Sequence, residues 1–358
     1  MNLVAFVHMY PPMHNAGAEH MMHAILSECV RHGHPCTAVV SGSYHQPFAD
    51  YDLDRVRVTA DTSAIKSADW ILTHLDRTAE ACSFGKPVAH IVHNNSSLKH
   101  YHPSRVDLVV YNTQHLADAI RYKAPSIVVH PPIWPDRYSV KPPKTGCVTL
   151  INLSEAKGGA LFFALARAMP DVRFLGVRGA YGRQLPTPDI PNLEVMDTQT
   201  DVRKVYRKTR VLLMPSSYES YGRCAMEAAV SGIPCIANPT PGLVEALGEA
   251  GTFPAKMSVE LWERAIRGVL VDWDAASSKA SARAAALDPS YDVARLIGAL
   301  ESQHVADPQG APRGLSYPIR IAVECKLGDV VYPAGSRIDR ATALALKEAG
   351  QLTDHRIQ

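Results

Sequence analysis

Two glutamates, Glu219 and Glu227, lie eight residues apart where an apolar run at 211–214 gives way to a polar loop and then to a helical pattern. We expect the helix to begin near Gly222, which places Glu227 about one and a half turns into it, able to face the same cleft as Glu219. The unpaired N–H groups at a helix start favour an anion, and a glycine there lets a phosphate approach the backbone. Carboxylates also accept hydrogen bonds from neighbouring hydroxyls, so one glutamate could hold a sugar ring and the other a ribose. The plain alternative is that Glu219 caps the helix and Glu227 is solvated.

A lysine and a histidine follow two other apolar runs. Lys157 comes after the run at 147–153 and precedes two glycines, where its flexible ammonium could reach a phosphate. It could equally be a surface lysine beside a turn. His93 ends the run at 88–92, which suits a catalytic imidazole, although a lone histidine at a strand end is more often a hydrogen-bonded structural residue.

Fourteen of the 16 histidines fall within residues 1–130, so a metal centre has to be considered. His20 and His23 have a helical spacing that can bind a metal, but no His-Glu-x-x-His pattern surrounds them and no cysteine set joins them. We therefore expect no metal site. The acidic triplet at 52–54 follows no core strand, and we expect its two aspartates to be solvated rather than to bind a metal.

The elements that must position these groups alternate in type along most of the chain. Strand-like runs and helical patterns succeed one another from the N-terminus to about residue 300, which is the order of a βαβ fold. Several runs are apolar throughout rather than alternating, as in parallel strands buried on both faces. In the first part, the strand-like runs are 3–7, 36–40, 70–72, 88–92, 107–111 and 127–129, with a helix at 18–31. The sequence therefore predicts an α/β fold whose first doubly wound domain covers residues 1–130.

Five prolines within residues 131–144 mark a stiff linker, because proline removes the N–H groups that helices and sheets need. The same alternation then resumes in a second domain, expected at 145–303. Its expected strands are 147–153, 172–176, 193–195, 211–214 and 233–237, and its expected helices begin near 158, 221, 258 and 290. Beyond a second linker at 304–315, residues 316–358 are expected to form a small α+β module, with strands at 319–323 and 330–332, a turn at 333–335 and a helix at 339–350. Because a module of about 43 residues can barely hold a core of its own, we expect it to pack on a partner.

The composition excludes several classes of protein. With 358 residues, 46% of them hydrophobic and 20% charged, the chain is long enough for two domains and too apolar for a disordered protein. Its 37 basic and 35 acidic residues leave a net charge of +2, which excludes a general basic surface for nucleic acid. No apolar run is long enough to span a membrane, the N-terminus has no signal-peptide pattern, and the seven cysteines include no Cys-x-x-Cys pair. We therefore expect a cytoplasmic protein with reduced thiols.

Four blocks in one order resemble the retaining family-4 glycosyltransferases of the GT-B fold, also called group 1 glycosyltransferases. They are Tyr10-Pro-Pro with Gly17-Ala-Glu19, His93 at a strand end, Lys157-Gly158, and Glu219-x7-Glu227 with its continuation at 228–237 and 240–245. The resemblance covers roughly residues 1–300. It implies two Rossmann-like domains that face each other across a cleft, the first binding an acceptor and the second a nucleotide-sugar.

By this resemblance the blocks have individual roles. The implied catalytic residues are His93, Glu219 and Lys157. The implied donor-binding residues are Gly17, Ala18, Asn152, Lys157, Arg178, Ser220, Tyr221, Gly222, Arg223 and Glu227, and the implied acceptor-binding residues are Tyr10, Asn94 and Asn95. That family usually has an arginine a few residues before the lysine, at the end of the same strand, where this chain has residues 151–155 with the uncharged Asn152. Because an uncharged amide cannot neutralise a leaving diphosphate, Arg178 or Arg223 would have to substitute for it. Otherwise Lys157 would act with backbone amides alone.

The resemblance implies transfer of a sugar from a UDP- or GDP-hexose to an acceptor hydroxyl, with retention of configuration and without a metal or a further cofactor. Two other functions stay open: a nucleotide-sugar epimerase or hydrolase, and a non-catalytic protein that binds a nucleotide-sugar or a glycan. The sequence does not specify the acceptor, which could be a glycan, a lipid, a protein or modified DNA. Residues 316–358 weakly resemble modules of phage-encoded proteins and would then dock the chain on its acceptor.

Overall fold

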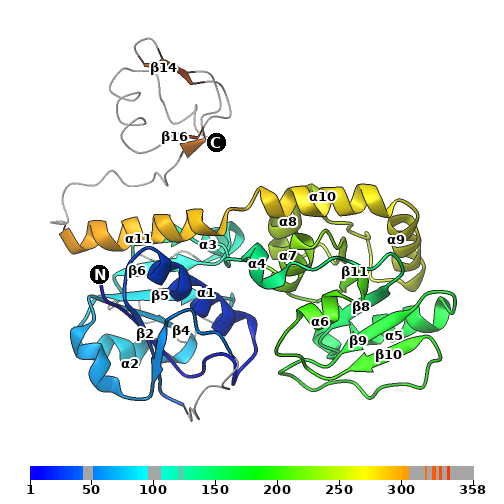
Figure 1. Cartoon of the computed structure of the whole chain (residues 1–358), viewed down its shortest axis with the longest axis horizontal. Coiled ribbons are helices and arrows are strands. Elements are labelled where there is room, and N and C mark those ends of the chain that lie inside the picture. Colours follow the sequence, from blue (N-terminus) through cyan, green and yellow to red (C-terminus); the bar gives the residue numbers. More distant parts are fainter. Residues whose placement is uncertain are drawn as a thin grey trace. The chain divides into compact units, whose positions relative to one another are not determined.

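The computed structural model describes residues 1–42, 51–95, 106–120, 122 and 124–305, together with the backbone of four short strands between 319 and 338. The chain divides into two compact units, Met1–Ala294 and Arg295–Gln358. The first unit contains two parallel sheets with helices packed around them (Figure 1).

In the described part of the chain, the first sheet has seven parallel strands in the order β3-β2-β1-β4-β5-β6-β7. They are β1 Leu3–Val7, β2 Cys36–Val40, β3 Arg57–Thr59, β4 Trp70–His74, β5 Val88–Val92, β6 Leu108–Tyr111 and β7 Ser126–Val128. Every residue of β1, β4 and β5 is buried, as expected for strands covered on both faces. The strand order changes direction between β1 and β4, where Ala5 lies beside Leu72. Ligands of such sheets bind in the crevice at the carboxyl ends of the strands at this switch point.

Helix α1, Gly17–Arg31, follows β1 and packs against β1 and β2. Its N-cap Ala16 makes no side-chain hydrogen bond, so no capping side chain occupies the first N–H groups of the helix. The other helices of this part are α2 Thr78–Ser83, α3 Gln114–Ala119 and α4 Pro135–Tyr138, with 3-10 turns at Thr62–Ser67 and Leu75–Arg77. The start of α1 therefore lies at the crevice of the first sheet with its backbone donors uncapped.

The second sheet, over the described residues, has five parallel strands in the order β10-β9-β8-β11-β12. They are β8 Cys147–Ile151, β9 Phe174–Val177, β10 Leu193–Met196, β11 Thr209–Met214 and β12 Cys235–Ala237. The helices in this later part of the chain are α5 Gly159–Ala168, α6 Arg203–Tyr206, α7 Arg223–Val230, α8 Pro241–Leu247, α9 Val259–Val271, α10 Trp273–Ala285 and α11 Pro289–Val305, with 3-10 turns at Glu155–Lys157 and Gly248–Ala250. The switch point lies between β8 and β11, and the loops after these two strands carry Lys157 and Glu219.

Two apolar clusters fix the helices on this second sheet. One joins Phe162 of α5 and Trp262 of α9 to the strands. The other joins Ala225 of α7 and Leu243 of α8 to Leu212 of β11. Burying each large apolar side chain contributes about 1.5–3 kcal/mol. The helices that carry the candidate site are thus held on the strands by packing.

The predicted α/β fold with two Rossmann-like sheets is confirmed. The structure adds strand β3 and the helices α2, α3, α6, α8 and α10, which the sequence analysis did not predict. It also places α4 inside the proline-rich segment 131–144, where only a linker was expected. The domain limits at 130, 145 and 303 stay predictions, since the compact units divide after Ala294.

The second unit contains two short antiparallel pairs. β13 Ile319–Arg320 pairs with β16 Arg337–Ile338, and β14 Cys325–Leu327 pairs with β15 Val330–Tyr332. The strand predicted at 319–323 is described only for its first two residues. The turn predicted at 333–335 and the helix predicted at 339–350 lie outside the described residues.

Two findings bear on the expected setting of the protein. Among the residues that the structure describes, no helix has the length and apolarity to cross a bilayer. The cysteines with described side chains, Cys29, Cys36, Cys82, Cys147, Cys224 and Cys235, are all free thiols.

Candidate functional site

The loop after β11 enters α7 through a glycine that the local geometry requires. Gly222 is the N-cap residue, with a φ of +89°, and a Cβ added to it would lie 2.4 Å from Cδ2 of Leu243. No side chain caps α7, so its first N–H groups remain for a ligand. The helix begins at Arg223, close to the predicted start, and has the uncapped start that an anion favours.

Lys157 and Glu219 form an ion pair at the switch point of the second sheet. Glu219 also accepts a hydrogen bond of 2.9 Å from the Ser216 hydroxyl. Gly158 follows Lys157 with a φ of +82°, and a Cβ there would lie 2.5 Å from Cγ of Pro215. Burial alone would lower the pKa of Lys157, but the charge of Glu219 raises it above its ordinary value. Lys157 is therefore a cation held in place by Glu219 at neutral pH.

Glu227 and Arg223 form a second, more deeply buried pair one helical turn apart. Their closest nitrogen and oxygen lie 3.2 Å apart, and the Tyr206 hydroxyl donates to Glu227 at 3.0 Å. Arg223 also donates to the Tyr138 hydroxyl at 2.9 Å and to the Pro132 carbonyl at 3.3 Å. Among the described residues, its buried Nε–H has no hydrogen-bond partner. Since a buried donor without a partner costs about 1–3 kcal/mol, a bound anion at this nitrogen would remove that cost.

A cavity of about 710 Å³ lies where α1 faces α7 and the ends of β8 and β9. Of the predicted donor-binding residues, Gly17, Arg178, Arg223 and Glu227 line it. A Cβ added to Gly17 would lie 3.6 Å from Cδ of Arg223, so the start of α1 closely approaches this guanidinium. His20 also lines the cavity, and burial lowers its pKa to about 3, which keeps the imidazole neutral. The volume falls in the range of about 300–1,000 Å³ that is typical of small-molecule sites.

The other predicted site residues lie outside this lining. They are the catalytic candidates His93, Lys157 and Glu219, the donor candidates Ala18, Asn152, Ser220, Tyr221 and Gly222, and the acceptor candidates Tyr10, Asn94 and Asn95. Tyr10 is buried, and its hydroxyl lies 2.8 Å from Nδ1 of His23. The backbone of Asn95 hydrogen-bonds the Tyr218 hydroxyl. The roles implied for these residues stay predictions.

Asn152 uses its side chain to shape its own loop. It has a φ of +75°, accepts hydrogen bonds from the Ser154 backbone at 3.1 Å and from Gln184 at 2.9 Å, and donates to the Tyr181 carbonyl at 3.3 Å. Arg178 and Arg223, the two candidates to replace a missing arginine charge here, both line the cavity. Arg178 is 41% exposed whereas Arg223 is 8% exposed, so Arg223 is the better shielded charge.

His93 is buried and is linked to both sheets. Its Nε2 lies 2.9 Å from Nδ1 of His74, and burial, followed by the charge of His74, holds the pKa of His93 well below its usual range. The side chain of Asn112 donates to the His93 carbonyl at 3.2 Å and to the Ser220 hydroxyl at 3.1 Å. The sequence analysis missed Asn112. The signal available was its position directly after the apolar run at 107–111, at the same sheet edge as His93.

The expectation that both aspartates of the 52–54 triplet are solvated is wrong for one of them. Asp52 is 81% exposed, whereas Asp54 is 12% exposed and forms an ion pair with Arg137. Asp54 also lies 3.4 Å from Nε2 of His23. A carboxylate can be buried here because these basic groups face it. Within the described residues no cluster of His, Cys, Asp and Glu side chains could hold a metal ion.

Residues 162–272 match the family described as "Glycosyl transferases group 1". The D-inositol 3-phosphate glycosyltransferase of Mycobacterium marinum is 30% identical over 133 residues, which is 33% of this chain and 28% of that protein. A glycogen synthase of Mycobacterium tuberculosis is 30% identical over 113 residues, or 31% of this chain and 27% of that protein. The match thus spans less than a third of these curated relatives.

Solved structures match over more of the chain at lower identity. Anabaena Alr3699/HepE, in complex with UDP and glucose, has a TM-score of 0.63 at 16% identity, over 84% of this chain and 100% of that one. A glycosyltransferase from Rickettsia africae has a TM-score of 0.64 at 13% identity, over 86% and 99%. The sucrose-phosphate synthase of Thermosynechococcus elongatus has a TM-score of 0.64 at 15% identity, over 85% and 99%. These likenesses show the GT-B fold, and the family match places residues 162–272 alongside the group 1 glycosyltransferases.

Proposed function

We propose that this chain transfers a sugar from a nucleoside-diphosphate sugar to an acceptor hydroxyl, with retention of configuration and without a metal. The observation that supports this most is the Lys157–Glu219 ion pair beside the uncapped start of α7. It puts a cation, a carboxylate and free N–H groups at one sheet edge. A diphosphate and the sugar that it carries need these groups together.

The leaving diphosphate is stabilised by charge that is already in place before the donor binds. The groups proposed to meet it are Lys157, the first N–H groups of α7, the Arg223 guanidinium and the start of α1 at Gly17. When Lys157 turns to the phosphate, Glu219 is released to accept hydrogen bonds from sugar hydroxyls. Glu227 keeps lone pairs beyond those used by Tyr206 and Arg223, and these accept the ribose hydroxyls.

The reaction that we propose is a front-side displacement. The bond between the anomeric carbon and the phosphate oxygen breaks, and the acceptor oxygen forms its bond on the same face of the sugar. The departing phosphate oxygen takes the proton of the acceptor hydroxyl. His93, which is neutral near pH 7, is proposed to orient the sugar by hydrogen bonding rather than to deliver a proton.

UDP-glucose is the first donor to test, because solved relatives of this fold are complexes with UDP, with UDP and glucose, or with UDP-glucose. A GDP-hexose is the second. The acceptor is proposed to be a glycan, a lipid, a protein or modified DNA, and residues 316–358 are proposed to dock the chain on it in the cytoplasm. Deleting residues 305–358 should then lower turnover of a macromolecular acceptor and leave donor binding intact.

The test is calorimetric titration of the full chain with UDP, GDP, UDP-glucose and GDP-mannose. Glu227→Ala and Lys157→Ala should each weaken binding of the preferred nucleotide at least tenfold, since each removes a charge-assisted hydrogen bond of about 1.5–3 kcal/mol. Glu260→Ala and Lys279→Ala remove exposed charges on α9 and α10 and should leave affinity unchanged. Failure of every nucleotide to bind would refute the proposal, and binding without transfer or hydrolysis would favour a non-catalytic binding protein.

The same titration separates the two candidate arginines. Arg223→Gln should cost more affinity for UDP than Arg178→Gln, because only Arg223 is buried with an unpartnered Nε–H. Retention is tested by the anomeric configuration of the product in proton NMR. Metal independence predicts that turnover in excess EDTA equals turnover in its absence.

A further inference from the structure

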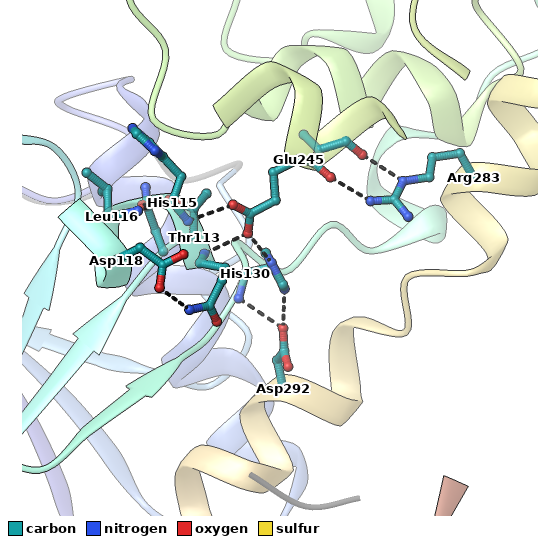
Figure 2. Close-up of polar contacts among 11 residues, drawn as sticks. Thr113, His115, Leu116, Asp118, His130, Glu245, Arg283 and Asp292 are labelled. Atoms are coloured by element: carbon teal, nitrogen blue, oxygen red, sulfur yellow. Dashed lines mark hydrogen bonds and ion pairs between the residues drawn. The ribbon is translucent and has the colours of Figure 1, made fainter. Parts of the chain in front are cut away.

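Helices α3 and α8 meet at one carboxylate. The backbone N–H groups of Gln114 and His115 donate to the two carboxylate oxygens of Glu245 at 2.7 and 2.9 Å (Figure 2). Thr113 caps the same turn by accepting from the Leu116 backbone at 3.3 Å. Glu245 is therefore a second cap for α3, supplied from the other parallel sheet's helices, and its negative charge suits a helix start.

The same carboxylate is joined to a charged histidine. Nε2 of His130 lies 2.9 Å from Glu245, and Nδ1 of His130 lies 2.8 Å from Asp292 on α11 (Figure 2). The His130 backbone N–H donates to Asp292 as well, at 2.9 Å. The ring of His130 lies 5.6 Å from the ring of Tyr221, which belongs to the loop that carries Glu219 and leads into α7. Glu245 of α8 thus contacts α3 and His130 directly, and it is linked to α11 through His130.

Helix α8 transmits this arrangement to the loop that carries Glu219. A Cβ added to Gly242 would lie 2.3 Å from the carbonyl group of Ser220 and 2.5 Å from the carbonyl oxygen of Glu219, so α8 rests directly on the loop backbone. At the other end of α8, Arg283 donates to the Glu245 carbonyl at 2.7 Å (Figure 2). Since the helix is in backbone contact with the loop, a shift of α8 would move the loop as well.

A second contact between the domains reaches the same loop from His93. Asn112, two residues before Gln114, donates to the His93 carbonyl and to the Ser220 hydroxyl. Residues 112–115 therefore touch the second domain at two points, through Asn112 and through Glu245. The two contacts together fix where the His93 strand end lies relative to the Glu219 loop.

We propose that Glu245 is a positioning residue for sugar transfer: by holding residues 112–115 against α8, it keeps His93 and the Glu219–Gly222 loop in one fixed arrangement. This inference rests on the proposed function for its catalytic consequence, but the mechanical link exists without it. Misplacing reacting groups by about 1 Å can cost roughly 100-fold in rate, so a residue that touches no substrate can still set the turnover rate.

Amide hydrogen exchange of the full chain, read by mass spectrometry, tests the link without any substrate. Glu245→Gln keeps the size of the side chain and removes its charge, and Glu249→Gln is the control, because Glu249 is exposed on the next turn, Gly248–Ala250. In Glu245→Gln we expect exchange to rise about tenfold at 113–118 and to rise also at 217–224. The control should match wild type in both segments. A rise confined to 113–118 would overturn the proposal.

Kinetics with UDP-glucose test the catalytic consequence. Glu245→Gln should lower kcat between about 10- and 100-fold while the Kd for UDP stays within about twofold of wild type, because the donor contacts themselves are kept. An unchanged kcat in a variant whose wild-type parent turns over would refute the positioning role. If wild type binds none of the tested nucleotides and does not turn over, the proposed function fails, and the exchange result still supports or overturns the link on its own.

Discussion

Raising the pH should lower the free energy of unfolding, because the imidazole of His130 then loses its proton. Burial alone would lower the pKa of this imidazole, but the carboxylates of Asp292 and Glu245 raise it from 6.5 to about 9. At about 1.4 kcal/mol for each pH unit, that difference corresponds to roughly 3 kcal/mol. Because the His130 side chain is 31% exposed, solvent screening reduces this energy, and we expect the proton to contribute about 1–3 kcal/mol to the free energy of unfolding.

The direction of this change in stability with pH depends on whether the folded or the unfolded state binds the His130 proton more tightly. The folded state has the higher pKa, so this contribution is complete below pH 6.5 and disappears as the pH rises through about 9. The Tyr221 ring also lies near His130, but burial raises the pKa of Tyr221, so this tyrosine does not reverse the sign.

The assay compares urea unfolding of wild type and His130→Gln from pH 6 to pH 10. Lysines, tyrosines and thiols elsewhere titrate in both proteins, so the difference in unfolding free energy isolates His130. We expect the advantage of wild type to shrink by about 1–3 kcal/mol between pH 7 and pH 10. A difference that stays constant, or grows, over this range would refute the account of the His130 ion pairs. The imidazole resonance absent from His130→Gln should titrate near 9 in the NMR spectrum of wild type.

Three further predictions follow from packing and hydrogen bonding. Gly242→Ala should lose about 1–3 kcal/mol of unfolding free energy in urea, because the new Cβ would lie 2.3 Å from the Ser220 backbone, whereas Gly268→Ala, with no atom within 4 Å of the new Cβ, should gain about 0.5–1 kcal/mol in α9. Trp262→Ala should lose about 3–5 kcal/mol in the same assay, since this ring is fully buried between α9 and the second sheet. Tyr206→Phe should weaken UDP binding about 3- to 10-fold by calorimetry because Glu227 loses a hydrogen-bond donor, and an unchanged affinity would contradict the ribose role of Glu227.

Much of the fold could be predicted because buried parallel strands leave a strong signal. Runs such as 3–7 and 88–92 are apolar at every position, and they form β1 and β5 with the predicted limits. Helix α10, Trp273–Ala285, gives no such signal, since it is rich in alanine and serine and Ala280 is its only buried residue. Its alanines favour a helix by intrinsic propensity, which a search for an apolar face does not detect. β3 was missed because an edge strand of three residues, none of them buried, resembles a loop.

The candidate site could be predicted only where residue type and local spacing decide its place. Gly222 at the start of α7 and Lys157 before Gly158 belong to this class, because a helix start and a glycine turn are local features. The hydrogen bonds of the Asn152 side chain do not belong to this class, because they depend on a positive φ at Asn152 and on Gln184, which lies 32 residues away. Asp54 was misjudged for the same reason: its partner Arg137 comes from a distant segment.

Residues that connect the parts of the chain around the two sheets, such as Glu245, are the hardest of the site residues to predict from the sequence. Glu245 ends the block at 240–245 that resembles the family, but its partners Gln114 and His115 use backbone N–H groups, which every residue except proline has. No pattern of side-chain types can reveal such a contact. Ligand-facing residues follow the chemistry of what they bind, whereas Glu245 and Asn112 bring together segments that are more than 100 residues apart in the sequence. It follows that a motif can indicate the chemistry of a candidate site, while contacts such as those of Glu245 and Asn112 are identified only from the folded structure.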